Sequence, residues 1–308
     1  MEKNSSVLVL LSTYCGAKFI SEQLDSLFNQ ENVSIDILIR DDGSNDNGAT
    51  LCIIKKFQER YPGKIKLIKG ENIGWMKSFL ELIRIASKLE KNFDYYAFCD
   101  QDDIWLPNKL YIATTHLTTD SKPRLYCSNL FYYSNEKVGD LIKNKHPNIT
   151  LENSLIRNQA IGCTIVFNRA LLDLLKITPK ELSVPHDFWA YQVAMFLGTV
   201  YFDPNGYIWY RQHENNQIGA KMTPVDRIKR RVKNIKSILN THTREIMAQE
   251  LISLYKPLLT KESIEIISGL ANYRKSLWSR ILFLRNKSRY FNGTTEIFVN
   301  TKIILGKI

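Results

Sequence analysis

The chain has 308 residues, of which 44% are hydrophobic and 11% aromatic, and its formal net charge is +11. This composition supplies a sizeable apolar core and excludes a disordered, collagen-like or low-complexity chain. The charge is uneven, because residues 1–220 carry 24 Lys and Arg against 25 Asp and Glu, whereas residues 221–308 carry 18 against 6. We therefore expect two parts with different partners, one spanning 1–220 and a basic one spanning 221–308.

Residues 7–99 alternate between short apolar runs and segments with helical periodicity. Strands are predicted at 7–11, 35–39, 65–68 and 95–99, with helices between them. This alternation indicates an α/β fold in which helices cover a mostly parallel sheet. Polar clusters follow the first, second and fourth strands, at 12–14, 41–42 and 100–103. Ligands bind at the carboxyl ends of such strands, so these clusters form the candidate site.

The pattern becomes less regular after residue 123. Strands are predicted at 125–133 and 163–167, and helices at 169–175 and 187–197. From residue 225 to about 287 apolar residues recur at helical spacing, and Lys and Arg fill many of the other positions. The sequence thus predicts that the basic part is an α-helical C-terminal region.

The cysteine pattern and the N-terminus bear on the compartment. The five cysteines are odd in number and none lies in a CxxC spacing, which argues against a disulfide framework and a structural zinc site. We expect free, mostly buried thiols. No apolar run reaches the ~18 residues of a membrane-spanning helix. Residues 1–6 lack the features of a secretory signal, so we expect a cytoplasmic protein.

The block Asp100-Gln101-Asp102-Asp103 places three carboxylates within four residues. Such carboxylates repel one another unless a cation neutralises them. Oxygen ligands without His or Cys nearby suit hard divalent ions such as Mg²⁺ or Mn²⁺. The alternative is that Asp102 or Asp103 caps a helix that begins after Pro107.

The other polar clusters suit a nucleotide. Asp41 can accept a hydrogen bond from a base or a ribose, and Tyr14 can stack on a base. Lys77, after the third strand, can meet a diphosphate. The alternatives are an ordinary turn at the DDGS sequence of residues 41–44 and a solvated surface lysine at position 77.

Taken together, these residues resemble glycosyltransferase family 2, whose members have the GT-A fold. The matching features, in chain order, are Ser12 and Tyr14, Glu22 and Gln30, the DDGS at 41–44, Asn72 and Gly74, and the acidic block at 100–103. The agreement covers residues 7–110 and extends more loosely to about residue 220. Cys15 is a departure, because the family commonly has Asn there.

Two further blocks narrow the resemblance. The DQDDIW at 100–105 and the RQHENN at 211–216 look like those of bacterial rhamnosyltransferases that build cell-wall, O-antigen or capsule polysaccharide. The resemblance implies inverting transfer of a sugar from a nucleotide-sugar donor, with Mn²⁺ or Mg²⁺ as cofactor. Rhamnose from dTDP-rhamnose is the first candidate, and a UDP-hexose is the alternative. The implied acceptor is a growing glycan linked to a polyprenyl diphosphate.

The resemblance also implies roles for individual residues. The donor-binding residues are Ser12, Thr13, Tyr14, Asp41, Asp42, Lys77, Asp100 and Gln101. The metal ligands are Asp102, assisted by Asp100, and His213. Asp187 is the catalytic base, and His186, Trp189 and Arg211 contact the acceptor or the diphosphate. The alternatives are a helix N-cap for Asp187, a packing role for His186 and a surface loop for His213.

The basic segment 225–290 is predicted to contact a membrane surface. An apolar stripe in it consists of Ile264, Ile267, Leu270, Tyr273, Leu277, Ile281 and Leu284, with Trp278 and Phe283 nearby. Aromatics mixed with Lys and Arg suit an anionic leaflet, so a peripheral location on the inner face of the cytoplasmic membrane is expected. The alternative is that the stripe packs on the catalytic domain or in a homodimer.

Other functions fit the sequence less well. A nucleic-acid partner is disfavoured because residues 1–220 have no basic patch. A nucleotidyltransferase usually has a glycine-rich phosphate loop after the first strand, and residues 12–16 do not provide one. A non-catalytic membrane-binding module leaves the carboxylates at the strand ends unexplained.

Overall fold

The structure is a computed structural model that describes residues 4–134, 137–141, 147–179, 181–212, 242–285 and 300–307. The chain divides into two compact units. The first consists of residues 1–147 and 160–211, and the second of residues 148–159 and 212–308. The boundary expected at 220 and 221 lies outside the described residues. Nothing in the sequence pattern assigned 148–159 to the second unit.

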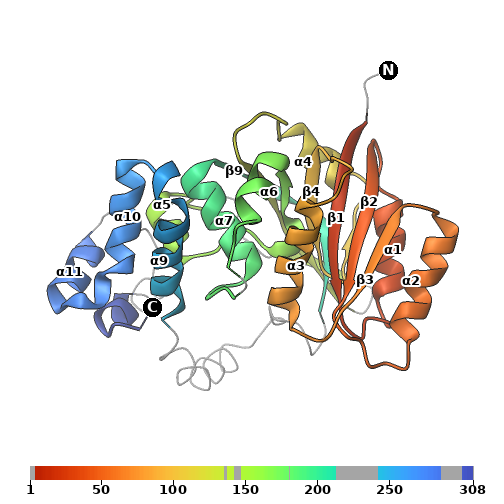
Figure 1. Cartoon of the computed structure of the whole chain (residues 1–308), viewed down its shortest axis with the longest axis horizontal. Helices are drawn as coiled ribbons and strands as arrows, with labels where there is room; N and C mark the ends of the chain where they lie inside the picture. The colour runs from red at the N-terminus through yellow and green to blue at the C-terminus, as the bar shows by residue number, and fades with distance from the viewer. Residues whose placement is uncertain are drawn as a thin grey trace. The chain divides into compact units, whose positions relative to one another are not determined.

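A nine-stranded sheet forms the centre of the first unit (Figure 1). Its strands are β1 (Ser5–Thr13), β2 (Val33–Asp41), β3 (Ile65–Lys69), β4 (Tyr95–Cys99), β5 (Ile104–Trp105), β6 (Arg124–Ser134), β7 (Lys137–Leu141), β8 (Val166–Asn168) and β9 (Thr199–Arg211). The spatial order is β3-β2-β1-β4-β8-β6-β9-β5, and β7 pairs with β6. The strands β3, β2, β1 and β4 are parallel, so their carboxyl ends lie along one edge.

Helices cover both faces of this sheet. They are α1 (Ile20–Phe28), α2 (Ala49–Arg60), α3 (Trp75–Ser87), α4 (Lys109–Thr115), α6 (Arg169–Leu175) and α7 (His186–Leu197). The first, second and fourth share one apolar cluster with the strands. Helices α3, α6 and α7 contact one another, and Figure 1 shows α3 on the face opposite α1 and α2. The predicted α/β class is confirmed.

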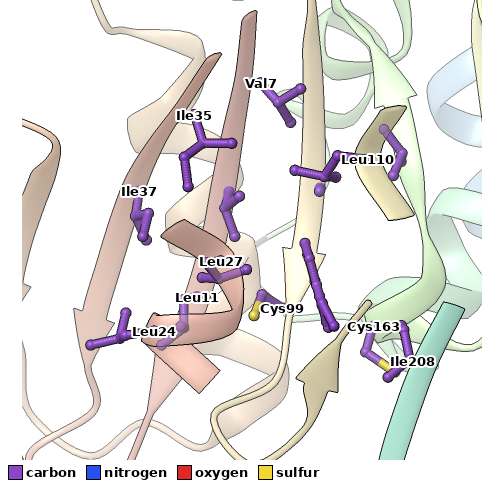
Figure 2. Packing of buried hydrophobic residues seen from close by; sticks show 14 of the residues in the cluster. Val7, Leu11, Leu24, Leu27, Ile35, Ile37, Cys99, Leu110, Cys163 and Ile208 are labelled. Carbon is purple, nitrogen blue, oxygen red and sulfur yellow. The ribbon is translucent and has the colours of Figure 1, made fainter. Parts of the chain in front are cut away.

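The core of the first unit follows from strand alternation. Val7, Val9 and Leu11 point to the same face of β1, where they meet Leu24 and Leu27 of α1 in one buried cluster. Figure 2 shows these leucines over the strands, with Cys99 and Cys163 among the aliphatic side chains. All five cysteines are free, and three are buried. The expected free thiols are therefore confirmed.

One predicted strand is shorter than expected, and one long strand was not predicted. The predicted strand 163–167 begins instead with the 3-10 turn η1 (Gly162–Thr164), and β8 covers only Val166–Asn168. The thirteen-residue strand β9 was missed. It contains the turn-forming sequence Asp203-Pro204-Asn205-Gly206, and its pairing with β6 shifts register at Asn129, beside this sequence. The irregularity hides the strand from a period-2 search.

The second unit is helical. Its elements are α5 (Leu151–Ile156), α9 (Thr243–Tyr255), η2 (Lys256–Leu258), α10 (Lys261–Ala271), η3 (Tyr273–Lys275) and α11 (Leu277–Arg285). Helix α5 packs against α9 and α10. In the described part of the chain, no helix is both long and apolar enough to cross a bilayer.

The predicted apolar stripe divides into a buried half and an exposed half. Ile267, Leu270 and Tyr273 of the second unit are buried, so these three side chains do not face a membrane. Leu277, Trp278, Ile281 and Leu282 of α11 are exposed, Trp278 by 61%. Phe283, which was expected beside the stripe that contacts a membrane, is buried, and its ring centroid lies 6.0 Å from that of Tyr273. Phe283 therefore belongs to the core of the unit.

Candidate active site

The ends of β1 and β4 are fastened together by Gln101. Its Oε1 accepts hydrogen bonds from Thr13 Oγ1 at 2.7 Å and from the backbone N–H of Tyr14 at 2.9 Å. Its Nε2 donates to the Tyr14 carbonyl at 3.2 Å. A Cβ added to Gly16 would lie 2.4 Å from Gln101 Oε1, so only glycine leaves room for this clamp. Thr13 and Gln101, both predicted donor contacts, are thus engaged with the protein itself.

Tyr14 remains open to a ligand. Its side chain is 41% exposed, and its hydroxyl lies 3.4 Å from Asn45 Oδ1. Ser12, by contrast, donates its hydroxyl to Ser78 Oγ at 2.7 Å. Cys15 has a φ of +47°, a conformation that Asn tolerates better than most side chains do. This backbone conformation explains why Asn suits the position that Cys15 occupies.

Asp41, the last residue of β2, and Asp42, which follows it, are buried and bonded within the protein. Asp41 accepts from the backbone N–H of Ser44 at 3.1 Å and also from its hydroxyl. Asp42 forms an ion pair with Arg40, and it accepts from the backbone N–H groups of Ile73 at 3.0 Å and Gly74 at 2.9 Å. Asp42 therefore holds the loop that leads into α3.

Lys77 lies on the surface of α3. Its Nζ is 2.6 Å from Glu181 Oε1, and both side chains are exposed. A diphosphate at this position has to displace Glu181. An exposed pair of this kind contributes little to stability, so the exchange is inexpensive.

The acidic block forms a loop between β4 and β5. The N-cap residue of α4 is Asn108, so the alternative in which Asp102 or Asp103 caps that helix is wrong. Arg211, at the end of β9, fixes the loop: its Nε donates to the Asp102 carbonyl at 3.0 Å, and its backbone N–H donates to Asp103 Oδ1 at 3.2 Å. Its guanidinium also pairs with Glu22 of α1 at 2.6 Å.

The carboxylates of this loop are crowded. Burial, together with the negative charges of Asp102 and Asp187, raises the pKa of Asp100 to about 7. Burial, with Asp102 and Asp100, also raises the pKa of Asp103 well above its usual range. Within the described residues Asp103 Oδ2 is buried without a hydrogen-bond partner. Carboxylates in this state fit a hard divalent cation, which would relieve their repulsion.

Cys163 adds a group that the sequence prediction did not include. Ligand atoms of Cys163, Asp100 and Asp103 lie within 4.8 Å of one another. Burial, followed by the charges of Asp103 and Asp100, raises the pKa of the Cys163 thiol, so this group stays protonated at neutral pH. A protonated thiol is a weak ligand, and the set therefore favours hard ions over soft ones.

Lys109 lies behind the acidic loop and was also missed. Its side chain is fully buried, and its Nζ is 3.4 Å from the centroid of the Trp105 ring. Burial lowers the pKa of Lys109 to about 7. Its Nζ has no hydrogen-bond partner in the described part of the chain. Nothing in the sequence around Lys109, which follows Pro107 at the start of a helix, distinguishes it from a lysine on the surface.

Asp187 lies in the first turn of α7, close to the acidic loop. The N-cap of α7 is Pro185, so the capping alternative for Asp187 is wrong. The side chain is half-buried, and its Oδ1 accepts from the backbone N–H of Phe188 at 2.7 Å. A Cβ added to Gly162 would lie 3.5 Å from Asp187 Cβ, which places η1 against this helix start. Cys163, the residue after Gly162, has its Sγ within 4.8 Å of a carboxylate oxygen of Asp100, so the structure brings Asp187 toward Asp100.

His186 and Trp189, the predicted substrate contacts on either side of Asp187, are too buried to touch a substrate. Trp189 is 0% exposed and donates its indole N–H to Thr178 Oγ1 at 2.9 Å. Its ring is core, so the predicted contact with acceptor or diphosphate is corrected to a packing role. His186 is also buried, and its ring stacks on Phe79 with centroids 3.9 Å apart. The predicted ligand His213 lies outside the described residues.

The sequence matches a family and named relatives. Residues 8–173 match the family model described as glycosyl transferase family 2. The dTDP-rhamnosyl transferase RfbG of Shigella flexneri is 34% identical over 222 residues, which cover 69% of this chain and 75% of the relative. The UDP-Glc:alpha-D-GlcNAc-diphosphoundecaprenol beta-1,3-glucosyltransferase WfgD of Escherichia coli is 28% identical over 168 residues, covering 54% and 62%.

Solved structures share the fold at lower identity. TarS 1-349 of S. aureus, in complex with UDP-GlcNAc, has a TM-score of 0.54 and 19% identity, with 97% of this chain and 90% of that chain covered. The mannosyltransferase PcManGT from Pyrobaculum calidifontis, in complex with GDP-Man and Mn²⁺, has a TM-score of 0.55 and 14% identity, covering 99% and 85%. The fold is therefore that of GT-A glycosyltransferases.

Proposed function

The chain belongs to glycosyltransferase family 2, and we propose that it is an inverting, metal-dependent enzyme that extends a lipid-linked bacterial polysaccharide. Glycosyl transfer from a nucleotide sugar is the activity of its family. The finer proposal rests on one observation, which is the place of Asp187: it lies against Gly162, and the next residue, Cys163, has its Sγ within 4.8 Å of carboxylate oxygens of Asp100 and Asp103. A base and a cation site near each other are what displacement at an anomeric carbon requires.

The proposed reaction assigns a role to each of these carboxylates. Asp187 accepts the proton of the acceptor hydroxyl while that oxygen attacks the anomeric carbon of the donor sugar. The bond from that carbon to the diphosphate oxygen breaks, and the electron pair leaves with the nucleoside diphosphate. Asp102 and Asp100 would hold the cation, which when bound supplies positive charge to the departing diphosphate. Attack opposite the leaving group inverts the configuration.

The donor proposal ranks two sugars. Transfer of rhamnose from dTDP-rhamnose is supported by RfbG, which is named a dTDP-rhamnosyl transferase. A UDP-hexose is the second candidate, supported by the name of WfgD, a UDP-Glc glucosyltransferase. Tyr14, with its exposed ring, is the proposed stacking partner of the base in either case, and Asp41 lies at the same edge of the sheet.

The acceptor proposal includes a membrane surface. Leu277, Trp278 and Leu282 of α11 expose apolar side chains next to the exposed basic residues Arg274 and Lys275. This combination supports contact between the region 221–308 and an anionic leaflet, where a polyprenyl-linked acceptor resides. The location would then be cytoplasmic and peripheral. A second copy of the chain is the alternative occupant of this surface.

A donor screen tests the catalytic proposal. The full chain is incubated with dTDP-rhamnose, UDP-glucose, UDP-galactose or UDP-GlcNAc, with Mn²⁺ or with EDTA, and released nucleoside diphosphate is measured. We expect release with one donor in Mn²⁺, loss of release in EDTA, and loss in Asp102→Ala at an unchanged melting temperature. The matched control is Asp120→Ala, which removes an exposed carboxylate of the same unit. Full activity in EDTA would contradict the metal proposal.

Vesicle binding tests the membrane proposal. The full chain and the variant Leu277→Ser/Trp278→Ser are sedimented with anionic vesicles at low and high salt. We expect binding that weakens with salt and is lost in the variant. Leu258→Ser serves as the control, because Leu258 is equally exposed but lies on η2. Equal binding by all three proteins would place the membrane contact elsewhere, and loss of a dimer in the variant would identify a subunit interface instead.

A further inference from the structure

Three large apolar side chains stand exposed where α3 begins. Ile73, Trp75 and Met76 are between 37% and 39% exposed. Single exposed apolar side chains are ordinary on a protein surface, but a cluster of them is not. The backbone beneath them is fixed, because the N–H groups of Ile73 and Gly74 both donate to the buried carboxylate of Asp42. Gly74 has a φ of +83°, which sets the entry into the helix. The cluster is therefore held in place by Asp42, directly after the end of β2.

The ring of Trp75 rests on a buried aromatic group. It meets His186 edge to face, with ring centroids 5.8 Å apart and planes at 74°. His186 in turn stacks on Phe79 at 3.9 Å and meets Phe98 at 4.8 Å and 90°. His186, Phe79 and Phe98 are buried, so Trp75 is supported from below while its own surface faces outward.

This support connects Trp75 to the candidate base. His186 is followed directly by Asp187, and both lie against Gly162, where an added Cβ would be 3.6 Å from His186 Nε2 and 3.5 Å from Asp187 Cβ. An acceptor whose hydroxyl reaches Asp187 has to place the rest of its ring over the surface beside α7. Helix α3, which carries Trp75, contacts α7 there.

We propose that Trp75 is the platform on which the sugar ring of the acceptor stacks while one of its hydroxyls faces Asp187. The C–H face of a pyranose is apolar, whereas its rim is polar, so it fits an exposed indole beside a carboxylate. The inference rests on the proposed function, and it names the acceptor subsite. Tyr14, which follows β1, remains the proposed stacking partner of the nucleobase of the donor.

A lipid surface fits this position less well than a sugar does. Glu71 precedes Ile73 by two residues and is exposed, and Asp187 directly follows His186, the residue that the Trp75 ring contacts. These carboxylates repel the anionic headgroups that the second unit would attract. The same carboxylates can accept hydrogen bonds from sugar hydroxyls.

The test separates the acceptor from the donor. Trp75→Ala, Trp75→Phe and the wild-type chain are assayed with the donor that the screen selects, with octyl glycosides of rhamnose, glucose and N-acetylglucosamine as acceptor probes. We expect Trp75→Ala to raise the KM for the acceptor at least tenfold, whereas Trp75→Phe stays within about threefold of the wild type. The KM for the donor, and nucleotide release without acceptor, should not change. Tyr111→Ala, on α4, is the control for loss of an exposed aromatic ring.

Each outcome decides between alternatives. An unchanged acceptor KM in Trp75→Ala overturns the platform, and an equal rise in donor KM assigns Trp75 to the donor instead. Tryptophan fluorescence gives a second measurement: acceptor added to the nucleotide-loaded protein should shift the emission of the wild type but not of Trp75→Phe. If the wild type releases no nucleotide from any donor, the proposed function itself fails. Acceptor-independent release combined with an unchanged acceptor KM in Trp75→Ala contradicts only the platform.

Discussion

The ends of β1 and β2 differ from the acidic loop after β4 in how their polar groups are satisfied. Thr13 donates to a side chain, and Asp41 and Asp42 accept from backbone N–H groups of nearby loops. In the acidic loop, by contrast, Asp103 Oδ2 is buried without a hydrogen-bond partner in the described chain, as is the Nζ of the neighbouring Lys109. Groups that are already paired build the fold, whereas crowded and unpaired ones are free to bind a ligand.

The largest expected effect on stability is at the first of these regions. Asp42→Ala removes the partner of the buried Arg40 and releases the N–H groups of Ile73 and Gly74. We expect the free energy of unfolding to fall by about 3–5 kcal/mol, because a buried charge loses its counter-ion. Urea denaturation measures this. The control Glu59→Ala removes the pair with Lys55, in which both side chains are exposed, and should barely move the transition.

The second prediction concerns the catalytic activity that depends on Asp187, close to the acidic loop. Asp187→Asn keeps the size of the side chain but loses its basicity. Transfer should fall by about 10²-fold or more, while the KM for the donor and the melting temperature stay near the wild-type values. Steady-state kinetics with varied donor and acceptor measures both. Near-normal turnover in this variant would show that Asp187 is not the catalytic base and that it has only a structural role in α7.

The third prediction is a gain in stability. Lys109→Met replaces a buried amine by an apolar side chain of similar length, which we expect to stabilise the fold by about 1 kcal/mol or more. The pKa of Lys109 is lowered to about 7 in the folded chain, below its ordinary value of about 10.4. Between these values the unfolded chain binds more protons, so the stability of the wild type rises with pH.

The pH dependence supplies the check on this third prediction. The advantage of Lys109→Met should therefore be greatest near pH 7 and below, and it should shrink toward pH 10. Denaturation of both proteins at pH 6.5 and 9 measures the difference. A variant that is less stable at both values would mean that the Lys109 charge supports the fold, through the Trp105 ring 3.4 Å away.

The smallest expected effect lies at the end of β1. Cys15→Asn places a side chain that tolerates a positive φ at a position with φ of +47°. We expect an increase in melting temperature that corresponds to a few tenths of a kcal/mol, with activity retained. Differential scanning calorimetry detects a change of this size. A decrease would indicate that the contact between the Cys15 thiol and Asn45 matters more than the backbone conformation.

The sequence predicted those parts of the protein that repeat a regular pattern. The strands that end at Thr13, Asp41 and Cys99 have continuous apolar runs, and the polar residues after them identified the edge that carries the site. The role of Asp42 could not be predicted, because its partners Ile73 and Gly74 lie about thirty residues away and contact it through their backbone.

Other features depend on packing that a pattern does not encode. The burial of Lys109 follows from the placement of α4 against the sheet, although lysine is usually exposed. Trp189 looked available on a helix beside Asp187, yet α7 is covered on nearly every side. The period of a helix indicates one apolar face, and it says little about a helix that is buried all round.

Helix α5 has a consequence for how the protein is made. The segment 148–159 is synthesised in the middle of the chain, but its partners α9 and α10 follow about ninety residues later. Until they emerge from the ribosome, Leu155 and Ile156, which are buried in the finished unit, have no surface to pack against. A chain that stops at residue 220 would keep these side chains exposed permanently. If such a chain aggregates, the cause would be that α5 lacks its packing partners, and not a defect of the sheet.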